Sequence, residues 1–406
     1  MTQLAGKHIV LGLSGGVACY KSAELCRLLV KAGATVQVVM TEAAEQFITP
    51  VTMQALSGRA VYTSQWDARE PNNMPHINLS READAILIAP CSADFIARLV
   101  QGRSDELLSL LCLARPIERV PLLLAPAMNR EMWLHPATQR NMAQVAQDGA
   151  VVLGVGNGAQ ACGETGDGRM LEPEEIFEDV VAQLSPKKLV GHHVLVTAGP
   201  TFEAIDPVRG ITNLSSGKMG FAIARAAREA GALVTLIAGP VHLPTPRGVQ
   251  RIDVKSAQQM FDAATTFAKE ASIFVATAAV ADWRPASASE QKIKKDGSGD
   301  VPALAFVENP DILAAIAHSS RAESGELFCV GFAAESENLL AHASAKRERK
   351  GVPLLVGNIG PATFGQDDNA LILIDADGHR EVPRASKQVL AQELVAEIAR
   401  RVPIKN

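Results

Sequence analysis

His8-Ile9-Val10-Leu11-Gly12-Leu13-Ser14-Gly15-Gly16 is an apolar run that ends in a small polar turn, and a segment with helical periodicity follows it to Ala32. The same arrangement recurs at His193-Val194-Leu195-Val196-Thr197-Ala198-Gly199-Pro200. Short apolar runs that alternate with helical segments are typical of parallel strands covered by helices on both faces. The sequence therefore predicts an α/β protein with two doubly wound, Rossmann-like domains, whose ligands lie beyond the carboxyl ends of the strands.

Further apolar runs of the same kind are expected to complete the two sheets. They cover residues 35–40, 85–89 and 120–124 in the first half, and residues 233–237, 273–277 and 327–331 in the second. A helical run over 174–184 stops before Pro186, which cannot continue a helix. This connector predicts two domains, residues 1–188 and 189–406. Residues 286–300 are expected to form a long loop, either a working part of a site or a disordered one.

The composition excludes several classes of protein. Of the 406 residues 47% are hydrophobic, and a net charge of -5 argues against a dedicated nucleic-acid binder. No apolar run reaches the roughly 18 residues that cross a membrane. The six cysteines are widely spread without a C-x-x-C pair, which fits a reducing cytoplasm and argues against a zinc or disulfide framework. We therefore expect a cytoplasmic protein that acts on small molecules.

Two segments of the first half are candidates for binding. Ser14-Gly15-Gly16 follows a strand and opens a helix, so its amides could bind an anion, although a tight turn explains the pattern equally well. Pro126-Ala127-Met128-Asn129-Arg130-Glu131-Met132-Trp133 follows the apolar run 120–125. Its Asn129 offers an acceptor and donors that could bind a carboxylate or an amide, but a hydrophobic turn is the alternative.

The second half offers two comparable candidates. Ser215-Ser216-Gly217 precedes a helical pattern and is either a second anion site or a helix start capped by Ser215 or Ser216. It lacks the spacing of a Walker A loop. Lys292–Lys295 lies on the long loop, where a lysine could reach phosphates or a carboxylate, or simply be solvated.

The first-half motifs resemble those of the flavin-dependent cysteine decarboxylases. The match rests on Pro126-Ala127-Met128-Asn129 with Met132-Trp133, on His76 in Pro75–Leu79, and on the glycine-rich segment 160–170. The resemblance implies a flavodoxin-like domain in which His76 assists a proton or hydride step, Asn129 holds the carboxylate that leaves as CO2, and Cys162 protonates an enethiolate. Cys91 and Asp94 depart from the family's flavin-binding pattern. The residues that it implies for binding FMN are Ser14, Gly15, Gly16, Thr41, Ser92, Asp94 and Met128.

The second-half motifs resemble the phosphopantothenate–cysteine ligases, and the two halves in this order resemble the bifunctional bacterial enzymes of coenzyme A biosynthesis. The resemblance implies CTP-dependent ligation of cysteine to 4'-phosphopantothenate through an acyl-cytidylate, with Mg2+, and then FMN-dependent decarboxylation to 4'-phosphopantetheine. Asn213 would orient the acyl intermediate, Lys292 would stabilise phosphoryl charge, and Arg209 would bind a substrate anion. The residues that it implies for substrate and nucleotide binding are Arg209, Ser215, Ser216, Gly217, Lys218, Ala278, Ala279, Val280, Asp282, Pro310, Asp311, Ile312, Leu313, Phe332, Lys346 and Lys350.

Some features of the second half stay open at this point. Lys346 and Lys350 are four residues apart, so they share a face of an expected helix that could also be plainly solvated. Phe202 and Gly210 stand where the resemblance implies a basic and an aromatic residue respectively. The sequence indicates no ligands for Mg2+. The resemblance also implies a homo-oligomer, with trimeric decarboxylase contacts and dimeric ligase contacts.

Three other functions compete with this interpretation. A flavin-dependent prenyltransferase or regulatory flavoprotein would leave the motifs of the second half without a role. A non-enzymatic interaction protein would bind no flavin and turn over no nucleotide. A nicotinamide dehydrogenase is disfavoured because G-x-G-x-x-G follows neither opening strand.

Overall fold

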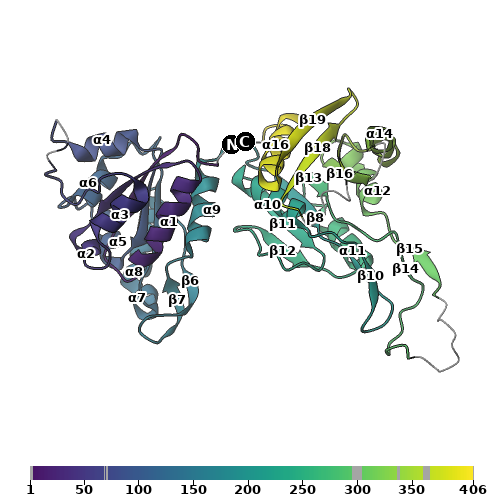
Figure 1. Ribbon diagram of the computed structural model, residues 1–406, viewed down its shortest axis with the longest axis horizontal. Helices are drawn as coiled ribbons and strands as arrows, with labels where there is room; N and C mark the ends of the chain where they lie inside the picture. Colours follow the sequence, from purple (N-terminus) through teal and green to yellow (C-terminus); the bar gives the residue numbers. More distant parts are fainter. Residues whose placement is uncertain are drawn as a thin grey trace. The chain divides into compact units, whose positions relative to one another are not determined.

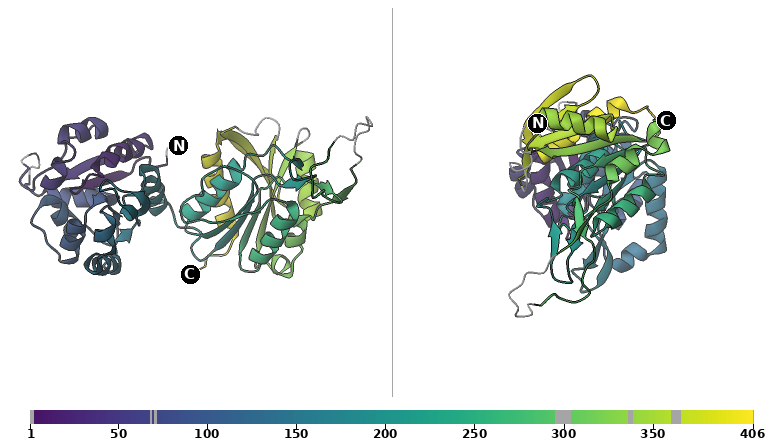
Figure 2. Two further views of the ribbon diagram at one scale, coloured as in Figure 1. Left: turned by 90° about the horizontal axis from the view of Figure 1, so that it is seen from below. Right: turned by 90° about the vertical axis from the view of Figure 1, so that its right-hand side faces the viewer.

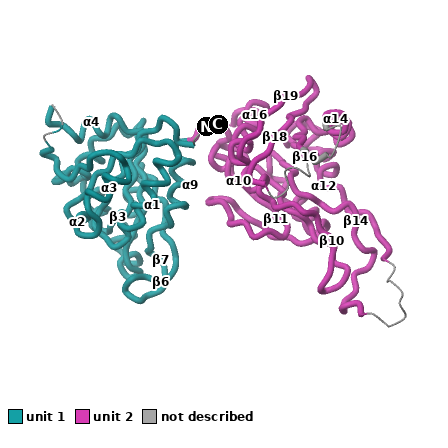
Figure 3. Tube along the Cα trace, viewed as in Figure 1, with its two compact units in different colours: residues 1–184 teal, residues 185–406 magenta. Residues whose placement is uncertain are grey.

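The structure is a computed structural model that describes residues 3–67, 69, 72–294, 304–335, 339–359 and 366–405 (Figure 1). The chain divides into two compact units, residues 1–184 and 185–406 (Figure 3). Each unit has a sheet and hydrophobic cores of its own. In the described parts of the chain, no helix combines the length and the apolar character that crossing a bilayer requires.

The sheet of unit 1 has five strands in the order β2-β1-β3-β4-β5, all parallel. Their bounds are β1 (His8–Leu13), β2 (Thr35–Met40), β3 (Ala85–Cys91), β4 (Leu122–Pro126) and β5 (Val151–Val152). Alternate residues of β1 enter different cores, Ile9 and Leu11 one and Val10 the other. Both faces of the sheet are therefore buried, which confirms the predicted doubly wound architecture.

Helices cover the two faces of this sheet. One core includes residues of α1 (Cys19–Lys31), α2 (Glu42–Glu45), α3 (Pro50–Ser57) and α9 (Pro173–Leu184). The other includes residues of α4 (Pro75–Glu82), α5 (Ala93–Val100), α6 (Leu107–Ala114) and α8 (Pro136–Gln147). Between β4 and α8 lies the short α7 (Arg130–Leu134), and the predicted glycine-rich segment forms an antiparallel hairpin of β6 (Gly156–Ala159) and β7 (Thr165–Arg169).

The sheet of unit 2 has eight strands in the order β12-β11-β8-β13-β16-β17-β18-β19. The first six are parallel and have the bounds β8 (His193–Ala198), β11 (Leu233–Ala238), β12 (Gln250–Asp253), β13 (Ile273–Ala276), β16 (Phe328–Glu335) and β17 (Leu354–Ile359). Four of these strands were predicted, namely β8, β11, β13 and β16. The sequence analysis missed β12 and β17, and also β18 (Asp368–Ile374) and β19 (His379–Ser386), which extend the sheet in antiparallel fashion. The sheet is therefore mixed at one edge.

Helices lie on both sides of this sheet as well (Figure 2). Residues of α10 (Lys218–Glu229) and α16 (Lys387–Arg401) enter one core, and residues of α11 (Ala257–Phe267), α12 (Ile312–Ala317) and α14 (Leu339–Lys350) enter the other. The short α13 (Ser320–Glu323) follows α12.

Two small antiparallel hairpins follow strands at the carboxyl edge of the sheet. After β8, β9 (Phe202–Ala204) pairs with β10 (Gly210–Thr212). After β13, β14 (Trp283–Pro285) pairs with β15 (Phe306–Glu308). The long loop expected over 286–300 lies between β14 and β15, and its residues 295–300, which include Lys295, lie outside the described residues.

Candidate functional site

A cavity of about 1100 Å³ opens in unit 1, where the carboxyl ends of its strands meet. It brings together residues from the loops after β1, β2, β3 and β4 and from the β6–β7 hairpin. The predicted site residues that line it are Ser14, Gly15, Gly16, Thr41, Ser92, Asp94, Met128, Asn129 and Cys162. The structure therefore gathers nearly all the residues of the predicted flavin site around one space.

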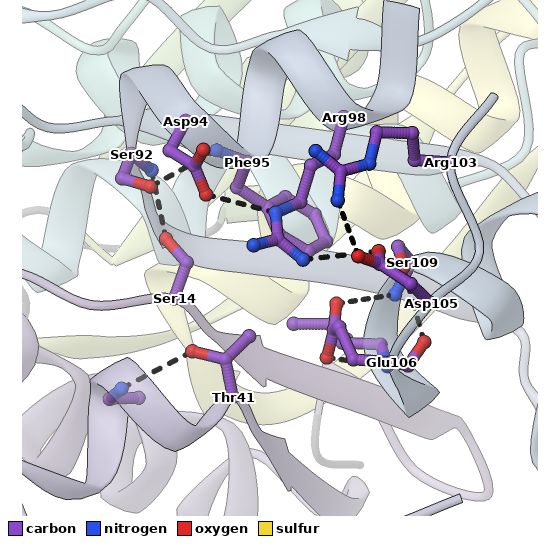
Figure 4. Close-up of polar contacts among 12 residues, drawn as sticks. Ser14, Thr41, Ser92, Asp94, Phe95, Arg98, Arg103, Asp105, Glu106 and Ser109 are labelled. Atoms are coloured by element: carbon purple, nitrogen blue, oxygen red, sulfur yellow. Dashed lines mark hydrogen bonds and ion pairs between the residues drawn. The ribbon is translucent and has the colours of Figure 1, made fainter. Parts of the chain in front are cut away.

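Three of the loops around this cavity are held by short polar contacts (Figure 4). The buried Ser14 hydroxyl donates to the Pro90 carbonyl (2.8 Å) and accepts from the Ser92 N–H (2.8 Å). Thr41 caps α2, its hydroxyl accepting from the Ala44 N–H (3.2 Å). A Cβ added at Gly15 would lie 2.6 Å from the Ala43 Cβ, so the turn after β1 approaches the start of α2 closely. These contacts leave a wall of backbone and small polar groups, which fits the phosphate end of a flavin nucleotide.

The turn Ser14-Gly15-Gly16 differs from the prediction in one respect. Helix α1 begins only at Cys19, after an Ala18 N-cap without a side-chain hydrogen bond. The two glycines therefore belong to the loop before the helix rather than to its first turn. Their place on the cavity wall favours an anion site over a turn that merely connects two elements.

The two departures from the family's flavin-binding pattern, one at the end of β3 and one at the start of α5, have different consequences. Cys91 is fully buried in a core, where burial raises the pKa of its thiol well above the ordinary value, so it does not line the cavity. Asp94 does line it, and its carboxylate accepts from Arg98 Nε (2.9 Å) (Figure 4). Arg98 also bonds to Asp105 (3.2 Å), so the added negative charge is placed in a network of charged groups.

Asn129 and Cys162 come from different elements but meet at one carboxylate, that of Glu164. The Asn129 side-chain N–H donates to Glu164 Oε2 (3.4 Å), and the Cys162 Sγ lies 3.5 Å from the same oxygen. Asn129 also caps α7, its Oδ1 accepting from the Met132 N–H (3.0 Å). The Asn129 amide, which here binds a carboxylate, and the accessible thiol of Cys162 therefore lie close together at the cavity.

Cys162 is exposed, whereas the other five cysteines are buried. Burial raises the pKa values of the Cys19 and Cys26 thiols to about 11. The exposed thiol is thus the one in a position to exchange a proton with a bound molecule.

His76 does not line this cavity. It lies in the first turn of α4 and is half-buried. Within one chain, the structure does not bring it together with Asn129 and Cys162.

The sequence analysis missed several residues of the cavity. Lys21 is buried (6% exposed), and its ammonium donates to the Met170 carbonyl (2.9 Å) and to Glu172 (2.8 Å). Arg98, Asp105 and Glu106 line the cavity and were also not singled out. Neither was Glu164, which accepts from the Asn129 amide. A lysine on the buried face of an amphipathic helix was the available signal for Lys21.

In unit 2 the predicted residues gather beyond the carboxyl ends of β8 and β13. The Asn213 amide donates to the Ala279 carbonyl (3.0 Å), and a bridge joins Ala279 to Pro200. Ala278, Ala279 and Val280 are all half-buried beside these contacts. Helix α10 begins at Lys218 after a Gly217 N-cap (φ +74°) without a side-chain cap, so neither Ser215 nor Ser216 caps it. Ser215 instead accepts from the Gly217 N–H (3.4 Å).

Lys218 forms an ion pair with Asp367 (2.6 Å) at the start of α10. A nucleotide phosphate at this helix start would meet a lysine that already has a carboxylate partner.

A second group of predicted residues lies around Lys350. It is the last residue of α14 and forms an ion pair with Asp311, the N-cap of α12. Burial lowers the pKa of Lys350, and the nearby Asp282 opposes this shift. Lys350 is therefore no solvated surface lysine (15% exposed). Lys346 lies on the same helix one turn earlier, as the spacing predicted.

The remaining predicted residues of unit 2 differ in exposure. Ile312 and Leu313 are buried in a core, so their side chains are unavailable to a ligand. Phe332 in β16 is half-buried, and so is Pro310, which precedes the Asp311 cap. Lys292 is exposed, and Arg209 bonds to Asp206 and to the Ile293 carbonyl (2.7 Å).

Phe202 and Gly210, which depart from the family pattern, are explained by each other. A Cβ at Gly210 would lie 2.3 Å from the Phe202 Cζ, so the ring occupies the space above the glycine. The Lys255 ammonium lies 4.9 Å from the centre of the same ring. An aromatic ring and a cation thus lie together at this hairpin, the ring from Phe202 of β9 and the cation from Lys255, which lies between β12 and α11.

The structure does not identify ligands for Mg2+. Among the described residues, no group of three or more histidine, cysteine or acidic side chains could hold a metal ion. A magnesium ion held mainly by nucleotide phosphates needs few protein ligands.

Comparison with known proteins adds family membership. Residues 1–185 match the model of the family Flavoprotein, and residues 189–402 match that of the DNA/pantothenate metabolism flavoprotein C-terminal domain. The chain is 50% identical to the coenzyme A biosynthesis bifunctional protein CoaBC of Haemophilus influenzae, over 98% of both chains. It is 49% identical to CoaBC of Vibrio cholerae (97% of this chain, 98% of the relative) and 46% identical to that of Escherichia coli K12 (99% of each). The chain therefore belongs to the family of the coenzyme A biosynthesis bifunctional proteins CoaBC.

Proposed function

We propose that this chain carries out two consecutive steps of coenzyme A biosynthesis, each in one unit. Residues of unit 2 ligate cysteine to 4'-phosphopantothenate at the expense of CTP, through an acyl-cytidylate. Unit 1 then decarboxylates the product to 4'-phosphopantetheine with FMN. The observation that carries the proposal is the 1100 Å³ cavity, where a wall of small polar groups and glycine amides adjoins Asn129 and Cys162.

FMN is the cofactor that this cavity would hold, with Ser14, Gly15, Gly16, Thr41 and Ser92 around its phosphate end. When bound, FMN supplies an acceptor for the two electrons of the substrate thiol, which becomes a thioaldehyde, and later returns them. The thioaldehyde is needed because loss of CO2 from an unactivated carboxylate would leave a carbanion whose charge could not delocalise, whereas the C=S group accepts that charge.

The residues of the chain perform the rest of the decarboxylation. The Asn129 amide, now bonded to the Glu164 carboxylate, would bind the carboxylate of the substrate in its place. After CO2 leaves, an enethiolate remains, and the Cys162 thiol donates the proton that accompanies the return of two electrons. Asp94 and Met128 would line the flavin.

His76 is proposed to act in the cavity of another copy of the chain. It lies outside its own cavity, so a homo-oligomer, trimeric through unit 1, would supply it. There it would assist removal of the proton or hydride from the substrate thiol and its neighbouring carbon.

In unit 2, the loops after β8 and β13 and the start of α10 are proposed to bind the phosphates of CTP and Mg2+. Asn213 would orient the acyl-cytidylate, and the cysteine amine would then attack its acyl carbon with release of CMP. Lys292 would stabilise the negative charge that builds up as pyrophosphate leaves. The proposed contacts to the nucleotide are Lys346, Lys350, Asp282, Asp311 and Phe332. We further propose that unit 2 forms a dimer. Since all six cysteines are free thiols, we place the protein in the reducing cytoplasm.

The test supplies the purified full chain with 4'-phosphopantothenate, cysteine and CTP and measures pyrophosphate and CO2 separately. We expect a yellow protein that releases both. Release of pyrophosphate without CO2 would refute the decarboxylase half of the proposal. A protein that releases neither of the two products would refute the whole proposal. His76→Asn is the internal control, because it should abolish CO2 release and leave pyrophosphate release intact.

A further inference from the structure

The turn that carries Arg209 and the segment that carries Lys292 meet at one buried carboxylate, that of Asp206 (0% exposed). Its Oδ1 accepts from the backbone N–H groups of Val208 and Arg209, both at 2.8 Å. Its Oδ2 accepts from Arg209 Nε (3.0 Å), from Arg209 Nη2 (2.5 Å) and from the Ile293 N–H (3.1 Å). The Arg209 side chain, and then these backbone donors, hold the pKa of Asp206 well below its usual range, so this group is ionised.

Two further hydrogen bonds join the same segments. Arg209 Nη2 donates to the Ile293 carbonyl (2.7 Å), and the Ser289 N–H donates to the Ile205 carbonyl (2.9 Å). Residues 205–209 and 289–293 are far apart in the sequence, yet they are fixed on either side of one charged side chain. We call this arrangement the Asp206 junction.

The Asp206 junction adjoins two proposed catalytic residues. Arg209 directly precedes β10, which ends one residue before Asn213. Lys292 directly precedes Ile293. Asn213 is itself tied to the sheet edge through Ala279, so the junction sets where the backbone of Lys292 lies relative to that edge.

Stability alone is a poor explanation for such a junction. Apolar side chains of similar volume often replace a buried ion pair without loss of stability. A carboxylate that accepts five hydrogen bonds does, however, fix distances between the segments that donate them. The donors of Arg209 that bond here, Nε and Nη2, are no longer available to form a fork with a substrate anion.

We propose that Asp206 and Arg209 are positioning residues for ligation, which hold Lys292 in place for the phosphoryl groups that react beside Asn213. In this role Arg209 acts through Asp206 and Ile293 instead of binding a substrate anion directly. The inference rests on the proposed ligase function of unit 2.

The test is a double-mutant cycle on the full-length protein, followed by pyrophosphate release with 4'-phosphopantothenate, cysteine and CTP. Misplacing a reacting group by about 1 Å costs on the order of 100-fold in rate. We therefore expect Asp206→Asn to lower kcat on the order of 100-fold, with little change in the KM for CTP. In a Lys292→Gln background the same change should have no further effect, because the residue it positions is gone. Losses that multiply, or an Asp206→Asn variant with the wild-type rate, would overturn the proposal.

Asp375→Asn is the matched control. Asp375 accepts from two backbone N–H groups, those of Asp377 (2.9 Å) and Gly378 (3.0 Å), and from Arg401 (2.7 Å), at the turn between β18 and β19. It should unfold at a lowered temperature, as Asp206→Asn should, but keep the wild-type kcat.

Arg209→Lys decides the matter if Asp206→Asn does not fold. A lysine keeps the charge but cannot bond to Asp206 and to the Ile293 carbonyl in the same geometry. The kcat of the Arg209→Lys variant should fall as that of Asp206→Asn does, and an unchanged rate would refute the positioning role. A wild-type protein that releases no pyrophosphate would overturn the proposed function and this inference with it. A wild-type protein that ligates, with no coupling between positions 206 and 292, would overturn the inference alone.

Discussion

Replacing Gly210 by alanine tests whether the Phe202 ring occupies the space that a side chain at position 210 would need. The new Cβ would lie 2.3 and 2.5 Å from two atoms of the ring and 2.6 Å from the Glu203 carbonyl oxygen. The half-buried ring could turn aside, but the carbonyl belongs to the backbone of β9, which pairs with β10 at this place. The hairpin must therefore distort to accept a single methyl group.

The size of the effect follows from the overlap. Forcing extra atoms into a filled space costs about 1–3 kcal/mol. In a domain of 150–250 residues, each kcal/mol lowers the melting temperature by about 2–4 °C, so Gly210→Ala should lower that of unit 2 by about 2–12 °C. Adding Phe202→Ala removes the ring and leaves the carbonyl contact, so the double variant should be less destabilised than the sum of the two single changes.

Calorimetry of the full chain provides the assay, with Gly156→Ala as the control. A Cβ at Gly156 has its nearest neighbours at 3.8 and 3.9 Å, so this change should leave the melting temperature of unit 1 almost unaltered. A Gly210→Ala protein that melts like wild type would refute the explanation. So would a destabilisation that is independent of the residue at position 202.

Three further predictions concern the sites. Cys162→Ser should still release pyrophosphate and CO2 but should yield a product two hydrogen atoms lighter by mass spectrometry, and a normal product would exclude the thiol as proton donor. Lys21→Met leaves the buried Met170 carbonyl without its partner, which should cost about 1–3 kcal/mol in urea unfolding and weaken the retention of FMN, measured by its absorbance after gel filtration. Because folding lowers the pKa of Asp206, its contribution to stability is fully present above its unfolded pKa of about 3.9 and is lost as the pH falls through its folded pKa. The gap in urea midpoint between wild type and Asp206→Asn should thus persist at neutral pH and shrink in acid, and a gap that widens in acid would contradict this sign.

Much of the fold could be predicted because its central strands are continuous apolar runs in the sequence. The run over β1 is rich in β-branched and leucine side chains, since both faces of the sheet are buried. Of the missed strands, β19 lies at the edge of the sheet, whereas β18 lies one strand further in and has an apolar run over residues 370–374 that the sequence analysis did not recognise. β19 has only Val382 buried among exposed residues, so it carries no apolar run.

The sites divide in the same way. Small polar residues and glycines directly after strands predicted the wall of the unit 1 cavity, because carboxyl ends of parallel strands share an edge. The Asp206 junction was beyond reach, since Arg209 and Ile293 are 84 residues apart in the sequence and meet only in the folded chain. The partners of Lys21 also lie far away in the sequence, 149 and 151 residues on, but the place of this lysine on the buried face of α1 was a signal that the sequence analysis overlooked.

The difference in exposure among the cysteine thiols determines which activity of this enzyme an oxidant would affect first. Five thiols are buried, and only that of Cys162 is exposed. Peroxide should therefore first block the final reduction in the second reaction, while ligation and the loss of CO2 continue and the product is released two hydrogen atoms short. The same asymmetry gives a chemist a native attachment point, since a maleimide dye would label the β6–β7 hairpin without removal of any other cysteine.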